Sequence, residues 1–334
     1  MALSDYLSEV KSVWGGTRRT IFTPSMRRYA DVLFIPDGFE SPGLYHTNGD
    51  ALLASQTHLL PENTTNTPIE RDRLWALFSS AEQIDTPVIY AGSVLNHYGH
   101  ALLSSLNRYW FMTLRKPDRP IIAHGPPPFS LPYMAFWLSH CGLGPDDFRP
   151  ITSPVRLKDV ALVQPSFEEL RQANDIFAKL CHNITKSAGV VVGVSKHLRP
   201  TYISKSRIQQ GVSRFVNEDE IDREMERLGA EIIYPEALPL EKQIEIFCNA
   251  SSIIGTACSA LHTALFVPGG CRITALTYQN IIHGNYLLVD KISRSRSKYL
   301  YAPSQQVQSQ DGFHLTFRLD DPKRVAQSLF VAAT

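Results

Sequence analysis

The sequence predicts an α/β protein built from two doubly wound domains that face a cleft. Short apolar runs of strand length alternate with helical periodicity along most of the chain, which is typical of parallel sheets covered by helices. The Pro-containing stretch 151–160 breaks this alternation, which then starts again. The 334 residues are enough to bury two cores of this kind. We therefore expect one domain over residues 1–155, a second over 156–319, and a final helix over 320–334 that packs back on the first domain.

The first half of the chain alternates strands with helices. Apolar runs predict strands at residues 31–35, 87–92 and 120–125. Between the last two, residues 99–115 carry large apolar side chains three and four positions apart, which predicts an amphipathic helix. A second helix is predicted at residues 131–141.

The second half repeats this pattern. Strands are predicted at residues 160–164, 189–194, 231–235, 252–255 and 272–278. Helices are predicted at residues 166–183, 217–229, 240–248 and 259–267, and a last one begins at Asp321 and Pro322. The helix over 217–229 is the best marked, because Asn217 is a typical N-cap residue and Glu220 completes a capping box.

Composition and charge argue against several function classes. The 33 Lys and Arg residues nearly balance the 32 Asp and Glu residues, so no bulk attraction to nucleic acid is expected. Apolar runs fall short of the roughly 20 residues that span a bilayer, and the first residues do not resemble a signal peptide. The five cysteines are an odd number without CxxC spacing, which favours reduced thiols and a cytoplasmic protein. The oligomeric state is left open by these features.

The segment 249–270 joins an apolar strand, a glycine turn and a helix of small residues. Gly255 ends the strand, Ser259 is placed to cap the helix, and His262 falls in its first turn. A helix N-terminus gathers unpaired N–H groups and a partial positive charge, so Thr256, Ser259 and the backbone could hold a diphosphate that His262 neutralises. A serine-capped packing helix with a satisfied histidine explains the same pattern. The sequence contains neither a dinucleotide fingerprint nor a P-loop.

Two groups of basic residues are candidates for anion binding. Lys205, Arg207 and Arg214 follow a short strand-like run, and their side chains could bind phosphate oxygens. A solvated basic loop is the alternative. The run RSRSK at 294–298 lacks the context of a strand and loop, which favours a solvated face, with attraction to a membrane surface as the second interpretation.

Two histidines, His97 and His100, open the predicted helix that follows residue 96. A histidine at a helix mouth beside the cleft would suit a general base, because its pKa lies near working pH. Structural roles for both histidines fit the same spacing. The spacing also occurs among metal ligands, but the sequence offers no matching cluster of His, Cys or Asp nearby, so no metal is expected.

Several blocks of the chain resemble, in order, the family 61 glycosyltransferases. The matching elements are GHALLSSLNRYW (99–110), TYISKSR (201–207), NEDE (217–220), GAEIIYPE (229–236) and CSALHTALF (258–266). The resemblance covers residues 90–280 with gaps, and it is best between residues 201 and 270. Each element is short, but their common order makes the resemblance specific.

The resemblance implies a GT-B architecture, in which two Rossmann-like domains bind the nucleotide sugar mostly on the C-terminal side. It also implies inverting transfer without an essential metal, so no cofactor is expected beyond the nucleotide-sugar substrate. Lys205 aligns with an arginine of the family, and Glu218 and Glu220 align with an acidic helix start. Ser259 and His262 match the form of the last motif that is associated with bacterial members.

The chain departs from the family pattern at residues that would carry the chemistry. The resemblance aligns an acid of the family with Ser104, so the base is expected elsewhere. His100 is the candidate, with His97 as second choice and an aspartate such as Asp50 as a further alternative. Lys205 keeps the charge of the aligned arginine but not its forked set of donors.

The sequence therefore predicts an inverting glycosyltransferase that moves a sugar from a nucleotide sugar, expected to be a UDP-sugar, to a hydroxyl of a glycan or glycolipid. The donor phosphates would be held by Lys205, Arg207, Arg214, Gly255, Thr256, Ser259 and His262. The expected setting is the synthesis of a bacterial surface polysaccharide or lipid-linked glycan, in the cytoplasm or peripherally at the inner face of the cell membrane. Two alternatives stay open: a catalytically degenerate protein of the same fold that binds a nucleotide or glycan, and another Rossmann-type nucleotide-sugar enzyme such as an epimerase.

Overall fold

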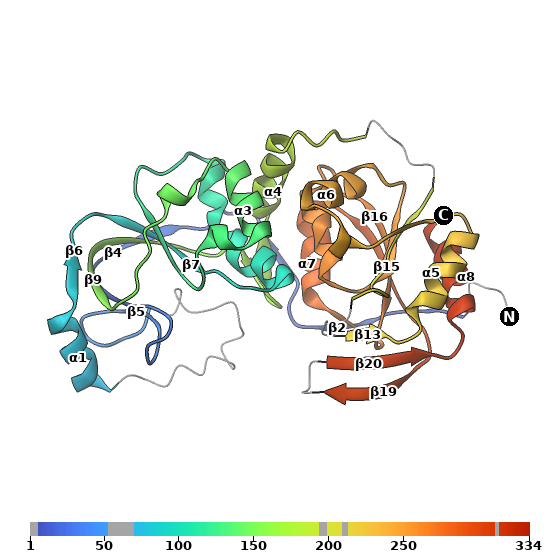
Figure 1. The fold of residues 1–334 in the computed structure, drawn as a ribbon, viewed down its shortest axis with the longest axis horizontal. Coiled ribbons are helices and arrows are strands. Elements are labelled where there is room, and N and C mark those ends of the chain that lie inside the picture. The colour runs from blue at the N-terminus through green and yellow to red at the C-terminus, as the bar shows by residue number, and fades with distance from the viewer. Residues whose placement is uncertain (1–5, 53–69, 194–198, 209–212, 311–313) are drawn as a thin grey trace. The chain divides into compact units, whose positions relative to one another are not determined.

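The computed structural model describes residues 6–52, 70–193, 199–208, 213–310 and 314–334. The protein is a mixed α/β protein with two compact units (Figure 1). Residues 19–184 form the N-terminal unit, and residues 185–334 together with residues 1–18 form the C-terminal unit. Within the described ranges, none of the helices has the length and apolar character that crossing a membrane requires.

The N-terminal unit is built on a six-stranded mixed sheet. Its strands are β4 (Met26–Ile35), β5 (Gly43–Tyr45), β6 (Glu82–Ile84), β7 (Val88–Ser93), β8 (Ile121–His124) and β9 (Val155–Val163). Their order is β5-β4-β9-β7-β8, and β6 pairs with β9. The pairs formed among β6, β7, β8 and β9 are parallel, whereas β4 runs antiparallel to both β5 and β9. The expected parallel sheet is therefore only partly present in this unit.

The units do not divide at the predicted residue 155. Strand β9 begins there and pairs with β4 on one side and β7 on the other, so it is central in the N-terminal sheet. Its residues Val160 and Leu162 are fully buried. The Pro-containing stretch thus leads into a core strand, and the chain changes unit later, within α4 (Asp175–Ser187).

Three helices and one irregular helical segment belong to the N-terminal unit. They are α1 (Arg71–Ser80), residues 98–113, α3 (Pro132–His140) and most of α4. The irregular segment begins as α2 (Tyr98–His100), widens to a π-helical turn over Ala101–Ser105 and tightens to a 3-10 helix over Leu106–Thr113. The helix predicted at 99–115 is confirmed in position. Mixed helical geometry of this kind is frequent at functional sites.

The segment predicted as one helix over 166–183 is different. Strand β11 (Gln172–Asn174) pairs with β10 (Phe167–Glu168) on one side and with β3 (Arg18–Thr20) on the other, and α4 begins only after β11. The amide oxygen of Asn174 accepts from the backbone N–H of Ile176 at 3.0 Å. This bond satisfies one of the free N–H groups of the first turn of α4, so the helix starts after Asn174 rather than before it.

The C-terminal unit is built on a second six-stranded sheet, of order β1-β18-β16-β15-β12-β14. Its strands are β1 (Ser8–Glu9), β12 (Thr201–Ile203), β14 (Glu231–Ile233), β15 (Ile253–Thr256), β16 (Arg272–Thr277) and β18 (Arg296–Tyr301). All neighbours in this sheet are parallel except β1, which runs antiparallel to β18. Three of these strands, β14, β15 and β16, lie where the apolar runs predict them, and β12 is the short strand-like run before Lys205. Strands β1 and β18 were not predicted.

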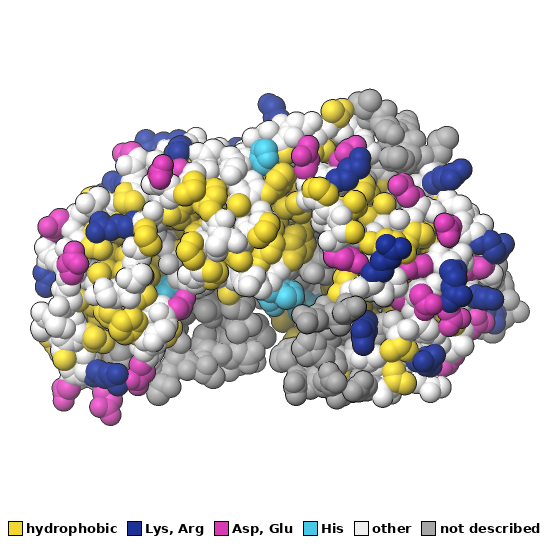
Figure 2. Space-filling view, in the orientation of Figure 1, with side chains coloured by type: hydrophobic (Ala, Val, Ile, Leu, Met, Phe, Trp, Pro, Cys, Tyr) yellow, Lys and Arg dark blue, Asp and Glu magenta, His cyan; other side chains and the backbone are white. Residues whose placement is uncertain are grey.

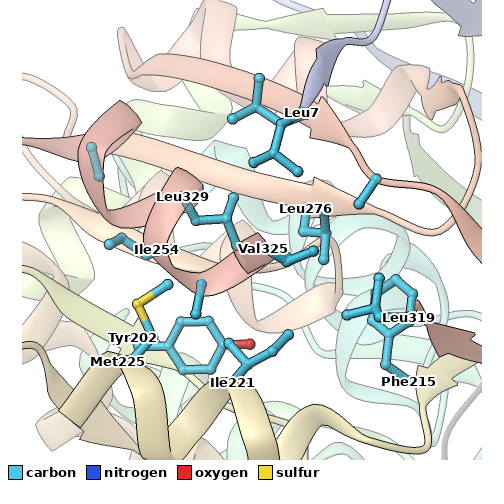
Figure 3. Packing of buried hydrophobic residues seen from close by; sticks show 14 of the residues in the cluster. Leu7, Tyr202, Phe215, Ile221, Met225, Ile254, Leu276, Leu319, Val325 and Leu329 are labelled. Carbon is cyan, nitrogen blue, oxygen red and sulfur yellow. The ribbon is translucent and has the colours of Figure 1, made fainter. Parts of the chain in front are cut away.

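Helices cover both faces of the C-terminal sheet (Figure 1). On one face α5 (Glu218–Arg227) packs against α8 (Pro322–Ala333), and on the other lie α6 (Leu240–Asn249), a 3-10 helix over Ser259–Phe266, and α7 (Gly284–Ser293). Figure 3 shows the core under α5 and α8, where Tyr202, Ile254 and Leu276 of the sheet meet Met225 and Leu329 of the helices. The parallel strands of this unit are therefore covered by helices on both faces.

The C-terminal helix was expected to pack back on the first domain, and the structure assigns α8 to the C-terminal unit. Helix α8 lies against α5, β15 and β16 of its own unit. Its residues Val325 and Leu329 are fully buried in the core shown in Figure 3. The apolar stripe that α8 presents is thus used within the C-terminal unit.

Smaller elements complete the C-terminal unit. Strands β13 (Ser213–Phe215), β20 (His314–Leu319) and β19 (Ser304–Gln310) form a three-stranded sheet, and β2 (Ser12–Trp14) pairs with β17 (Ile281–His283). Short 3-10 helices occur at Pro128–Ser130, Pro145–Asp147 and Pro235–Ala237. Residues 190–193 do not form the strand predicted at 189–194, because Val191 and Val192 are 59% and 41% exposed and pack against no core, and residue 194 lies outside the described residues.

Candidate functional site

The order in which the chain adds parallel strands to the C-terminal sheet reverses once. The chain goes from β12 outward to β14, then crosses to β15 on the other side of β12 and continues to β16 and β18. Sheets of this order bind ligands outside the carboxyl ends of the strands where the order reverses. The loops that leave β12 after Ile203 and β15 after Thr256 begin at that point. They carry Lys205, Arg207 and Ser259, three of the residues predicted to hold the donor phosphates.

A buried carboxylate joins these two loops. Glu218 Oε1 accepts a hydrogen bond from Thr256 Oγ1 at 2.9 Å and another from the backbone N–H of Lys205 at 3.1 Å. The Tyr202 hydroxyl donates a third at 3.1 Å. Burial raises the pKa of the Glu218 carboxyl above its ordinary value, although the donors around it act in the opposite direction. Glu218, which the resemblance aligns with the acidic helix start of the family, thus holds both loops through hydrogen bonds.

The capping box predicted for α5 is absent from the described first turn of that helix. Asn217 occupies the N-cap position, but its side chain makes no hydrogen bond to that turn. Its amide instead pairs with the backbone of Leu319, donating to the carbonyl at 3.0 Å and accepting from the N–H at 3.1 Å. Asn217 therefore connects the start of α5 to the end of β20.

The three basic residues predicted to bind phosphate lie in three different settings. The Lys205 ammonium donates to the Ser213 carbonyl and, at 3.1 Å, to the Tyr278 hydroxyl. The Arg207 guanidinium lies over the Tyr234 ring, 3.6 Å from its centre. Arg214 is an exposed residue of β13. Residues 209–212, which connect these positions, lie outside the described residues.

Arg207 lines a groove of about 760 Å³ between α5 and β14. The groove contains the arginines Arg199, Arg207 and Arg223 together with the acidic residues Asp219, Asp222, Glu226 and Glu231. Figure 2 shows basic and acidic side chains intermingled over this part of the C-terminal unit. The charges of the groove are therefore mixed, in keeping with the near-neutral chain.

The end of β15 brings its backbone close to β12. A Cβ at Gly255 would lie 3.0 Å from the Ile203 carbonyl oxygen, which is tighter than ordinary contacts, so glycine suits this position. Thr256 is fully buried and uses its hydroxyl on Glu218. These two residues therefore shape the loop, and a direct contact with phosphate stays a prediction for them.

The helix that follows β15 begins at Ser259, the first residue of the predicted range, but a different residue caps it. Cys258 is the N-cap residue, Ser259 is the first residue of the helix, and the helix has 3-10 geometry. His262 is 6% exposed, and the centre of its ring lies 4.8 Å from that of Tyr286. The prediction that Ser259 is the N-cap residue is thus wrong. The roles of Ser259 and His262 in donor binding stay predictions.

The strand order of the N-terminal sheet also reverses once. The chain goes from β7 to β8 on one side and returns to β9 on the other side of β7. The carboxyl ends of β7 and β9 therefore flank the position at which such sheets bind ligands. His97 and His100 follow β7, and Glu169 follows β9.

The His100 ring and the Glu169 carboxyl are within hydrogen-bond distance at this position. His100 Nδ1 lies 2.9 Å from Glu169 Oε1, and the Ser104 hydroxyl donates to the same oxygen. The Glu169 side chain is 11% exposed and that of His100 is 42% exposed. Sequence reasoning missed Glu169, because the segment around it was predicted to be a helix and no motif marked it.

The electrostatics distinguish the two histidines. The hydrogen bond to Glu169 raises the pKa of His100, against the lowering effect of burial. The pKa of His97 is lowered by burial and by the neighbouring His100, whose ring centre is 5.0 Å away. His100 is therefore the stronger base of the pair. The alternative base, Asp50, is an exposed residue that bonds with Asn48 within a turn.

The described residues around His97 and His100 do not form a metal site. Over the ranges that the structure describes, no three His, Cys, Asp or Glu side chains are grouped so that they could hold a metal ion. Instead, one ring nitrogen of His100, Nδ1, faces the Glu169 carboxylate, to which the Ser104 hydroxyl also donates. A histidine held in this way is suited to proton transfer.

Comparison with known proteins gives one match. A sequence profile of the family described as Glycosyltransferase 61 matches residues 98–274. The match begins in the helical segment of the N-terminal unit and ends in β16, so it includes the described residues of both sites: His100, Glu169, Lys205, Glu218, Thr256 and Ser259. None of the curated proteins compared with the chain matches it.

Proposed function

The chain belongs to glycosyltransferase family 61 and is a glycosyltransferase, and we propose that it is an inverting, metal-independent enzyme of the GT-B type. In this proposal the C-terminal unit binds a UDP-sugar donor, and the N-terminal unit carries the base that activates the acceptor. One observation supports both assignments. In each unit the candidate residues follow strands at which the strand order reverses, which is where α/β sheets bind ligands.

The proposed reaction is a single displacement. His100 takes the proton of an acceptor hydroxyl, and the oxygen attacks the anomeric carbon from the face opposite the diphosphate. The bond between that carbon and the diphosphate oxygen breaks, and negative charge develops on the leaving group. Backbone N–H groups at the start of the helix over Ser259–Phe266, with the charges of Lys205 and Arg207, would stabilise it.

We further propose that the acceptor is a glycan or glycolipid hydroxyl in the synthesis of a bacterial surface polysaccharide or lipid-linked glycan. The proposed location is the cytoplasm, with a peripheral contact at the inner face of the cell membrane. Arg294 and Arg296 are exposed and support this contact, because basic side chains are attracted to anionic lipids.

A degenerate protein that binds a nucleotide or glycan without turnover is the second candidate. Its support is Ser104, which stands where the resemblance places an acid. The structure weighs against it, because the Glu169 carboxylate contacts Ser104 and His100. A carboxylate is thus present beside the candidate base.

Thermal unfolding with nucleotides, together with an assay of sugar transfer, tests the proposal. UDP at about 100 times its Kd is expected to stabilise the fold by ~2.7 kcal/mol, because it binds only the folded state. Lys205→Gln is expected to weaken this effect, since it removes a positive charge from the loop after β12. The matched control is Lys242→Gln, at an exposed lysine of α6 paired with Glu245, and it should leave the effect unchanged.

The same measurements separate the candidates. UDP stabilisation together with sugar transfer from a UDP-sugar supports the enzyme. UDP stabilisation without turnover of any sugar nucleotide would favour the degenerate binding protein. If CMP, GDP, ATP and NAD also give no shift in midpoint and no transfer is found, the nucleotide-sugar proposal is wrong.

A further inference from the structure

The carboxylate beside His100 comes from a distant part of the chain. Glu169 stands between β10 and β11, 69 residues after His100. Its Oε1 atom accepts from the Ser104 hydroxyl and contacts His100 Nδ1 at 2.9 Å. His100 and Ser104 are four residues apart, so they lie on adjacent turns of one helical segment. The single oxygen therefore bridges two turns of the segment that carries the base.

The turn that presents Glu169 is held in an unusual conformation. Leu170 has a φ of +58°, in the left-handed region that a residue with a Cβ rarely adopts. The N–H of Arg171 bonds the Glu168 carbonyl at 3.1 Å, and the side chains of these two residues pair at 2.9 Å. Strain of this kind persists where the surroundings fix it, and it gathers at functional sites. Both neighbours of Glu169 are therefore fixed in place.

We infer that Glu169 is the positioning residue of the base: it holds the His100 proton on Nδ1 and leaves Nε2 to take the proton of the acceptor hydroxyl. This inference rests on the proposed function, in which His100 is the base. An ionised carboxylate can only accept a hydrogen bond, so the contact at 2.9 Å selects the tautomer with hydrogen on Nδ1. The same charge stabilises the imidazolium that forms when Nε2 gains a proton.

Ser104 is the second part of this arrangement. Its hydroxyl donates to the same oxygen that faces His100, so it limits rotation of the carboxylate. Because the Glu169 side chain is 11% exposed, little water competes for these bonds. The His100 side chain is 42% exposed, so it is much more accessible than the Glu169 side chain.

Glu169→Gln tests the inference through two measurements on the full chain. The first is an NMR titration of His100 without substrate. His97 and Glu169 both face His100, and loss of the negative charge of Glu169 is expected to lower the pKa of His100. The second is sugar transfer, in which kcat is expected to fall on the order of 10²-fold while KM for the donor is unchanged. The acidic limb of the pH–rate profile should move to lower pH.

Two further variants make the test specific. Asp118→Asn removes a negative charge from an exposed acid of the N-terminal unit, which pairs with Arg119, and it should change neither measurement. The double variant Ser104→Glu with Glu169→Ser places a carboxylate on the helical segment that carries His100. Part of the loss in kcat, and part of the decrease in the pKa of His100, should then be reversed.

The outcomes of the two measurements are distinguishable. An unchanged His100 pKa in Glu169→Gln overturns the inference, whether or not the chain transfers sugar. A lowered pKa with unchanged kcat overturns it as well, because the contact would then have no part in the reaction. A wild-type chain that transfers no sugar, with a His100 pKa that still falls in Glu169→Gln, refutes the proposed function while the Glu169 contact stands.

Discussion

Glu218 accepts three hydrogen bonds on one oxygen, and the donors come from separate places in the C-terminal unit. Tyr202 belongs to β12, Lys205 to the loop after it, and Thr256 to the end of β15. A buried polar atom that loses a partner costs more free energy than the bond itself contributes. The three bonds therefore hold together the loops that would surround a donor phosphate.

Thr256→Val tests this dependence at a single residue. Valine has nearly the shape of threonine but no hydroxyl, so Glu218 loses the donor at 2.9 Å. The free energy of unfolding is expected to fall by about 1–3 kcal/mol. Denaturant unfolding at neutral pH measures this change, with Thr256→Ser as the control that keeps the hydroxyl. Equal stability of the valine and serine variants would contradict the role given to this bond.

At the scale of elements, the partly buried acid Asp290 joins α7 to β18. Asp290 of α7 accepts from the Ser297 hydroxyl at 2.6 Å and from the Tyr299 hydroxyl at 2.7 Å, both in β18. Burial raises the pKa of Asp290 to about 6, although both donors act to lower it. The folded chain thus takes up a proton here at a pH where an unfolded aspartate is ionised.

The expected pH dependence follows from that shift. Because the pKa of Asp290 is higher in the folded state, its contribution to stability is present below pH ~4 and is lost as the pH rises through about 6. Relative to Asp290→Asn, the wild type should lose on the order of 2 kcal/mol of unfolding free energy between pH 4 and pH 7. Denaturant unfolding of both proteins at the two pH values measures this difference. Parallel pH dependence of the two proteins would show that Asp290 does not titrate in this range.

Elements could be predicted where apolar residues form an uninterrupted strand. The runs at 31–35 and 252–255 are buried in β4 and β15 because both of their faces are covered. The same rule fails for β18, where exposed Arg296 and Lys298 alternate with less exposed residues and conceal a strand. The rule also predicts a strand that is not formed, at residues 190–193, where the apolar run does not pair with a sheet.

The site could be predicted only in part, for a related reason. His100 and Lys205 are recognisable by residue type at the start of a helix and after a strand. Glu169 and Glu218 act through partners 69 and 38 residues away, and such contacts depend on how the strands are ordered. Local patterns in the sequence contain no information on that order.

At the scale of the molecule, the first residues of the chain belong to the same unit as the last. Strand β1 pairs with β18, β2 pairs with β17, and the Lys291 side chain donates to the Thr17 carbonyl at 2.6 Å. Leu7 is 9% exposed and lies in the core that α5 and α8 cover, as Figure 3 shows. The C-terminal unit therefore needs the start of the chain to complete its core.

Leu7→Ala should accordingly destabilise the C-terminal unit. Truncation of a buried leucine removes apolar contacts and leaves a cavity, so a loss of about 2 kcal/mol is expected. Native-state hydrogen exchange resolves the effect by region, because amides exchange through the opening of their own structural unit. Exchange should quicken in β16 and β18 and stay unchanged in β7 and β9.

Leu114→Ala, at a leucine of the N-terminal unit that is 66% exposed, is the control and should change neither region. Equal acceleration of β7 and β9 by Leu7→Ala would mean that the two units unfold together, and no acceleration anywhere would mean that the start of the chain is not needed for the core.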